Sequence, residues 1–149
     1  MSTYEPRLIC FSCKFSWGYL ADQQELAHKI NNWIPIVCTG KVDTTHILGA
    51  FKNGADGVLI LGCPEGHCHY QDGNFEMRKR VLMLQKTLES YGIEKERIQV
   101  HLSVDPEGNT IPQIVNHMSE SIRALGPLRM TGTKKVDPSA VMNSKVEVK

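Results

Sequence analysis

Short apolar runs alternate along this chain with segments in which apolar residues recur every three or four positions. Four runs predict β-strands, at residues 7–11, 34–38, 58–61 and 98–104. The third run is uninterrupted and stands between Gly57 and Gly62, a pattern typical of a strand buried on both faces of a parallel sheet. Pro35 lacks the N–H that a central strand needs, so it should lie at the start of its strand or on an edge strand.

The segments with three- and four-residue periodicity predict four helices. The first and the fourth also carry capping-box spacing, from Asp22 to Glu25 and from Thr110 to Gln113. The predicted N-terminal caps are Asp22, Asp43, Asn74 and Thr110, and the residues predicted to face inward are Leu26, Ile30, Trp33, Ile47, Leu48, Phe51, Met77, Val81, Leu84, Leu88, Tyr91, Ile111, Ile114, Val115, Met118, Ile122 and Leu125.

Strand and helix follow one another four times, which predicts an α/β fold. Right-handed crossovers between parallel strands place helices on both faces of a sheet. We therefore expect a single open, doubly wound sheet of about four parallel strands, flavodoxin-like in architecture. Residues 1–130 are predicted to form this domain. Residues 131–149 are polar and without periodicity, and are predicted to be a flexible tail.

Composition narrows the class of function. The 149 residues carry a formal net charge of +1, whereas nucleic-acid-binding domains more often show a basic stripe, so we expect no nucleic-acid partner. No apolar run approaches the roughly 20 residues of a membrane span, and the first residues lack a signal-peptide pattern, so we expect a cytoplasmic protein. Five cysteines in that setting favour metal binding or redox chemistry over a disulfide scaffold.

Four of the cysteines follow predicted strands. Cys13 comes after the first strand, Cys38 closes the second, and Cys63 and Cys68 follow the third. The carboxyl ends of neighbouring parallel strands lie about 4.8 Å apart, so these thiols are predicted to gather at one edge of the sheet. Thiolates select zinc, copper(I) or iron–sulfur clusters, and four cysteines are the usual complement of a 2Fe–2S or 4Fe–4S cluster.

Two other chemistries compete with a cluster. Cys63, Cys68 and either His67 or His69, with one further cysteine, have the ligand types of a tetrahedral zinc site. Cys10 and Cys13 have the spacing of a thiol–disulfide motif between a strand and a helix. Cys10 is otherwise interpreted as a small apolar residue that fills the core.

Basic and aromatic residues accompany the cysteines. Lys14 and Lys41 flank the candidate ligands, where they would favour a reduced cluster or simply be solvated. The run of residues 78–80 either faces solvent or docks an acidic partner. Three aromatic residues near Cys13 are predicted to pack over the site or against a partner; these are Phe15, Trp17 and Tyr19.

Several motifs resemble one known family. They are Cys38-Thr-Gly-Lys-Val-Asp43, Ala50-Phe-Lys-Asn-Gly-Ala-Asp-Gly-Val58, Gly62-Cys-Pro-Glu-Gly-His-Cys-His-Tyr70 with Gly73-Asn74, Tyr91-Gly-Ile-Glu-Lys-Glu-Arg97 and Leu125-Gly-Pro127. They resemble the delta-subunit family of methyl-viologen-reducing hydrogenase over residues 5 to 127. The resemblance departs from the family at Ser16, where a further cysteine is usual, and at Ser12, where some members have cysteine.

The resemblance implies an electron-transfer subunit with no catalytic site of its own. It implies a 2Fe–2S cluster on Cys13, Cys38, Cys63 and Cys68. It also implies two partners: a hydrogenase or formate dehydrogenase-type subunit, and the flavin- and iron–sulfur-containing subunit of a heterodisulfide reductase-type complex. The alternative is a metal-free or zinc-bound docking subunit of such a complex.

Overall fold

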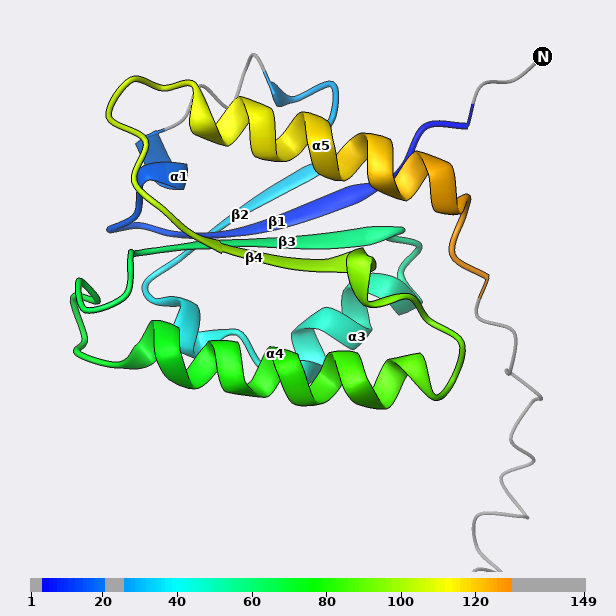
Figure 1. The fold of residues 1–149 in the computed structure, drawn as a ribbon, viewed down its shortest axis with the longest axis horizontal. Helices are drawn as coiled ribbons and strands as arrows, with labels where there is room; N and C mark the ends of the chain where they lie inside the picture. Colours follow the sequence, from blue (N-terminus) through cyan, green and yellow to red (C-terminus); the bar gives the residue numbers. More distant parts are fainter. Residues whose placement is uncertain (1–3, 21–25, 130–149) are drawn as a thin grey trace, which may run out of the picture.

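The computed structural model describes residues 4–20 and 26–129 (Figure 1). The predicted tail at 131–149 lies outside these residues and stays a prediction. Within the described ranges, no helix is both long and apolar enough to cross a membrane. The elements are β1 (Leu8–Cys13), α1 (Trp17–Leu20), β2 (Asn32–Ile36), the 3-10 turn η1 (Thr39–Lys41), α3 (Thr44–Lys52), β3 (Gly57–Gly62), α4 (Gly73–Glu89), the 3-10 turn η2 (Lys95–Arg97), β4 (Ile98–Leu102) and α5 (Thr110–Leu125).

The four strands form one parallel sheet in the order β2-β1-β3-β4. In Figure 1, α1 and α5 lie above the sheet, while α3 and α4 lie below it. The predicted α/β fold, doubly wound and flavodoxin-like, is therefore confirmed. β2 is an edge strand, so the missing N–H of Pro35 is tolerated, as expected.

The core is divided between the two faces of the sheet. Every residue of β3 is buried, and its side chains alternate. Val58 and Ile60 pack with the inward residues of α3 and α4, whereas Leu59 and Leu61 pack with those of α5. Burying each such side chain contributes about 1.5–3 kcal/mol, which is why this strand is apolar at successive positions rather than at alternate ones.

The first predicted helix and the second strand need correction. Asp22 and Glu25 lie outside the described residues. Leu26 and Ile30 are buried in the core as predicted, but Trp33 lies in β2, which begins earlier than expected and ends at Ile36. The chain joins the sheet already at residue 31, because Asn31 N donates to Leu8 O (2.9 Å) and Asn31 Oδ1 accepts from Leu8 N (2.9 Å).

Two of the other three predicted caps are also displaced. Asp43 caps α3 as predicted, and forms a capping box with His46. The N-cap of α4 is Asp72, and Asn74 lies inside the first turn. The N-cap of α5 is Asn109, and the predicted capping box from Thr110 is absent from this described helix.

The start of α5 is held by a residue outside the helix. The Asp105 carboxylate accepts hydrogen bonds from the backbone N–H groups of Thr110 (2.8 Å) and Ile111 (2.9 Å). Burial of this carboxyl opposes its ionisation, but the N–H groups outweigh burial and lower the pKa of Asp105. Three residues predicted to face inward are instead exposed, because they lie at the margins of their helices' buried faces or beyond a helix end: Leu48, Tyr91 and Leu125.

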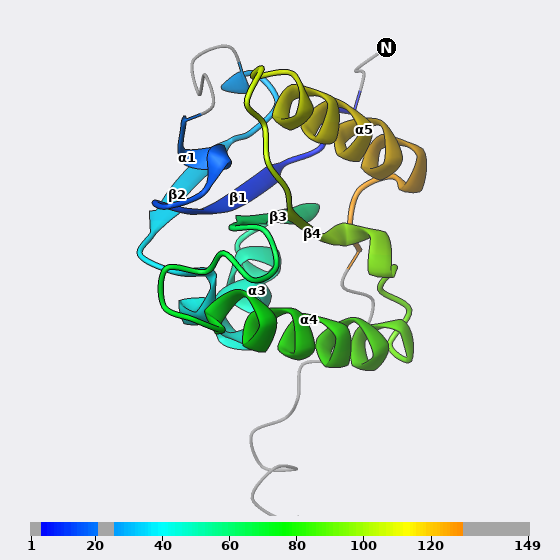
Figure 2. The ribbon, with the colours of Figure 1, turned by 60° about the vertical axis from the view of Figure 1, so that its left-hand side comes forward.

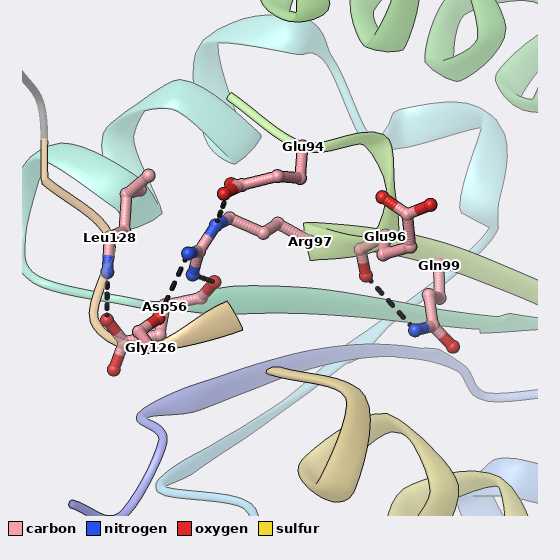
Figure 3. Close-up of polar contacts among 7 residues, drawn as sticks. All are labelled: Asp56, Glu94, Glu96, Arg97, Gln99, Gly126 and Leu128. Carbon is pink, nitrogen blue, oxygen red and sulfur yellow. Dashed lines mark hydrogen bonds and ion pairs between the residues drawn. The ribbon is translucent and has the colours of Figure 1, made fainter. Parts of the chain in front are cut away.

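A buried arginine ties together the edge of the sheet opposite the cysteines (Figure 3). Arg97 is 2% exposed, and its guanidinium donates to Glu94 Oε2 (2.6 Å), Asp56 O (3.0 Å) and Gly126 O (2.9 Å). The Asp56 carboxylate accepts from the Leu128 N–H (2.9 Å). The guanidinium holds the pKa of Glu94 below its usual range. One side chain thus joins η2, the start of β3 and the segment after α5.

Arg97→Met is expected to lower the free energy of unfolding by about 2–3 kcal/mol, since two carbonyl oxygens lose a charged donor in a buried setting. Urea unfolding measures this as a lower midpoint with an unchanged slope. Arg123→Met is the matched control, because its ion pair with Glu5 is exposed and should contribute less than about 1 kcal/mol. Equal effects of the two changes would show that the Arg97 network is not stabilising.

Candidate functional site

The four predicted ligands lie at the carboxyl edge of the sheet, on the left of Figure 1 and turned forward in Figure 2. Cys13 is the last residue of β1, and Cys63 follows β3, its neighbour in the sheet. Cys38 follows β2 and caps η1, and Cys68 lies in the loop between β3 and α4. After β1 the chain turns to one face of the sheet, and after β3 to the other. Such a crevice is where doubly wound sheets bind ligands.

The four thiols form two pairs. The Sγ atoms of Cys13 and Cys63 are 3.9 Å apart, and those of Cys38 and Cys68 are 3.8 Å apart. Two thiolates bound tetrahedrally to one metal at about 2.3 Å are themselves about 3.8 Å apart. Each pair therefore has the spacing of two ligands on one metal. In the described part of the chain, no three His, Cys, Asp or Glu side chains come close enough to hold a metal ion.

Ionisation differs between the thiols. Burial, with the neighbouring Cys13, raises the pKa of Cys63 to about 12. Burial also raises the pKa of Cys38, although the Gly40 N–H donates to its sulfur (3.4 Å). Burial opposes ionisation of Cys68 as well, but backbone N–H groups, first that of Asn74, outweigh it and lower the pKa of Cys68. In the metal-free pair, Cys68 therefore ionises before Cys38.

The first turn of α4 holds the loop that contains Cys63. Asn74 is buried, and its Nδ2 donates to Cys63 O (2.9 Å) and Pro64 O (3.1 Å). Its Oδ1 accepts from the Phe75 N–H (2.8 Å). The sequence pattern correctly marked Asn74 as special but assigned it the wrong role, because the side chain satisfies the carbonyl groups of the thiol loop rather than capping the helix.

The next turn of α4 holds the loop that contains Cys38. Arg80 donates to Gly40 O (3.1 Å) and Val42 O (2.6 Å), so η1 is bound to the helix by a charged donor. Sequence reasoning missed this role and treated residues 78–80 as one charged run. Helical periodicity contained the signal, because Arg80 lies three residues after buried Met77 and four before buried Leu84.

The other two residues of that run face outward. Arg78 forms an ion pair with Glu65, and Lys79 pairs with Glu76 (2.9 Å) and lies over the Phe75 ring (4.4 Å). For these two, the interpretation as a solvated face agrees with their exposure and their local partners.

Gly73 brings α4 against the thiols. A Cβ at this position would lie 2.4 Å from Cys38 Sγ and 3.5 Å from Cys68 Sγ. A Cβ on Gly40 would in turn lie 2.9 Å from the Cα of Gly73. The two glycines therefore permit an approach of backbone to sulfur that any side chain would prevent.

Cys10 does not belong to the site. It is fully buried and packs in the cluster on the α5 face, whereas Cys13 is paired with Cys63. Residues three apart on a strand point to opposite faces, so the thiol–disulfide interpretation of Cys10 and Cys13 is wrong. Cys10 is core filler, as the alternative predicted.

The histidine-containing zinc site is not formed within the described residues either, since no three-ligand group exists there. His69 instead stacks on the Phe15 ring, with ring centroids 4.0 Å apart, and Tyr70 meets the same ring edge-on. Phe15 thus packs beside the site, as expected of this aromatic group.

The two serines that depart from the resemblance are both buried. Ser16 Oγ donates to Cys13 O (2.7 Å), which fixes the turn after β1. Ser12 is in β1 one residue before Cys13, so its side chain points to the other face, toward Gly18. A cysteine at position 12 would therefore face away from the pairs.

Fold and site define a doubly wound α/β domain that gathers four thiols at the crevice of its sheet. The sequence profile of the methyl-viologen-reducing hydrogenase delta subunit matches residues 8–126, and the chain belongs to this family. The resemblance inferred from its motifs is thereby confirmed.

Named relatives agree with this membership. The vhc iron-sulfur subunit of F420-non-reducing hydrogenase from Methanococcus voltae is 35% identical, over 90% of this chain and 96% of the relative. The iron-sulfur subunit of F420-non-reducing hydrogenase from Archaeoglobus profundus is 33% identical, over 85% and 95%. The chain is also 28% identical, over 80% of its length, to a segment of the Ferredoxin/F(420)H(2)-dependent CoB-CoM heterodisulfide reductase of Methanosarcina acetivorans, where the match covers 15% of that polypeptide.

Gly73→Ala is expected to separate Cys38 from Cys68, because the added methyl group overlaps Cys38 Sγ. In metal-free, reduced protein, diamide should then join these two cysteines about tenfold more slowly, the effect of an overpacking cost of about 1–3 kcal/mol. Peptide mass spectrometry measures the disulfide. Gly49→Ala, where a Cβ meets nothing within 4 Å, is the control and should react like the unaltered protein. An unchanged rate in Gly73→Ala would contradict the close approach.

Proposed function

We propose that this protein is an iron–sulfur electron-transfer subunit of a complex that couples a hydrogenase-type module to a heterodisulfide reductase-type module. The observation that carries the proposal is the arrangement of its thiols as two pairs, each with the spacing of two ligands on one metal. Membership of the hydrogenase delta-subunit family supports the same role.

The donor set fits a 2Fe–2S cluster. Such a cluster takes four cysteine thiolates, two on each iron, whereas a 4Fe–4S cluster takes one on each. We therefore assign Cys13 and Cys63 to one iron, and Cys38 and Cys68 to the other. When bound, the cluster supplies one-electron chemistry, and the chain contributes no bond-making group of its own.

The surrounding residues are suited to tuning the potential of such a centre. Hydrogen bonds to thiolate sulfurs and burial are the protein's means of doing so. The Gly40 N–H donates to Cys38, and backbone N–H groups after Cys68 stabilise its thiolate. Lys14 and Lys41 are exposed on neighbouring loops, where their charge favours the reduced, more negative state.

Relatives suggest the partners. In Methanosarcina acetivorans a similar segment makes up 15% of a longer heterodisulfide reductase polypeptide. When a domain is covalently part of one protein, it is kept at high effective concentration beside its neighbour. We propose that the present chain associates non-covalently with the corresponding flavin- and iron–sulfur-containing subunit, and receives electrons from a hydrogenase or formate dehydrogenase-type subunit.

Anaerobically purified protein is expected to be coloured and to contain about two iron and two sulfide ions per chain. Cys63→Ser and Cys68→Ser should each abolish the visible absorption and the paramagnetic signal of the reduced cluster, because each removes one of four ligands. Cys10→Ser is the matched control, and should retain both signals. Colourless protein with stoichiometric zinc, or with no metal, would instead identify a docking subunit.

A further inference from the structure

The two thiol pairs differ in their access to solvent. Cys13 and Cys63 are 3% and 4% exposed. Cys68 is only half-buried, and Cys38 borders an open hollow of about 440 Å³. The lining of this hollow is Val37, Cys38, Gly40, Lys41, Tyr70 and Gly73. The Cys38–Cys68 pair is therefore the one that an approaching protein reaches first.

Exposed apolar side chains surround this pair. Val37 is 46% exposed, Tyr70 is 49% exposed and Phe15 is 51% exposed. They come from the loops after β2, β3 and β1, and the rings of Phe15, His69 and Tyr70 form one stacked group. Aromatic side chains are enriched at the centres of protein interfaces, where they anchor a partner. We call Phe15, Val37 and Tyr70 the apolar collar.

The charged residues beside the collar are basic and have no local partner. In the described ranges, neither Lys14 nor Lys41 has a carboxylate within ion-pair distance, whereas Arg78 and Lys79 are each paired with a glutamate. Carboxylates on a partner would complement Lys14 and Lys41, and charges at a rim act mainly on the rate and specificity of association.

The exposed face of α4 is the rival surface. It presents Phe75, Leu82 and Met83, with Lys79 lying over Phe75. Each helical residue advances about 1.5 Å, so Met83 lies roughly 15 Å along the axis from Gly73, where α4 touches the thiols. A protein seated on the middle of α4 would contact neither pair.

From these observations we infer that the apolar collar with Lys14 and Lys41 is the docking surface for the heterodisulfide reductase-type flavin subunit. The partner's docking face is then apolar at its centre and carries carboxylates at its rim. This inference rests on the proposed function, which supplies the reason for a redox partner to approach the Cys38–Cys68 pair.

The test uses the full chain and the flavin-containing heterodisulfide reductase-type subunit of the same organism. Binding is measured by calorimetry, and association rates are measured at several salt concentrations. Lys41→Glu should weaken binding about tenfold at low salt, mainly through a slower association rate, and the loss should shrink at high salt. Val37→Asp should weaken binding at every salt concentration, because it places a charge in the apolar centre.

Lys86→Glu and Leu82→Glu, both on the exposed face of α4, are the matched controls and should bind normally. Weaker binding in these controls, with Lys41→Glu and Val37→Asp unaffected, would overturn the inference in favour of α4. Normal binding by all four variants would overturn it as well.

The visible spectrum of each variant separates this inference from the proposed function. If the unaltered protein holds no cluster, the proposed function fails, yet weaker binding by Lys41→Glu still supports the docking surface. If the cluster is present in every variant and binding is unchanged, the docking surface fails and the proposed function stands.

Discussion

The first two turns of α4 hold the two thiol loops at a fixed separation. The loops expose backbone carbonyl groups at the end of the sheet, where the regular ladder no longer pairs them, and buried carbonyl groups need donors. Asn74 supplies donors to the loop of Cys63, and Arg80 supplies them to the loop of Cys38. Gly73 lies between them and contacts the Cys38 sulfur. One helix therefore sets the relation between the two pairs.

Stability and chemistry are placed at opposite edges of the same sheet. The buried Arg97 network secures the amino edge, where the chain enters β3 and leaves α5. The carboxyl edge contains the thiols, whose loops carry exposed apolar side chains and an open hollow. Between the edges, β3 is buried throughout and contacts both halves of the core, so it transmits the rigidity of one edge to the other.

Sequence reasoning recovered the architecture because that information is local. An uninterrupted apolar run defines β3, and three- and four-residue steps define α4 and α5, so the topology and the shared edge of Cys13, Cys38, Cys63 and Cys68 follow. The pairing of the thiols could not be predicted, because it depends on loop conformations. The roles of Asn74 and Arg80 were missed for a related reason, since both side chains bind carbonyl groups that are distant in sequence.

The pairing also has a consequence for the thermodynamics of the fold. Cys13 and Cys63 are 50 positions apart, Cys38 and Cys68 are 30 apart, and the two intervals overlap. A group bound by both pairs would therefore close two interlocked loops of the polypeptide. Closing such loops removes entropy from the unfolded chain, so occupancy and folding become linked equilibria. The midpoint of unfolding would then report how full the site is, and loss of the bound group would loosen the carboxyl edge of the sheet first.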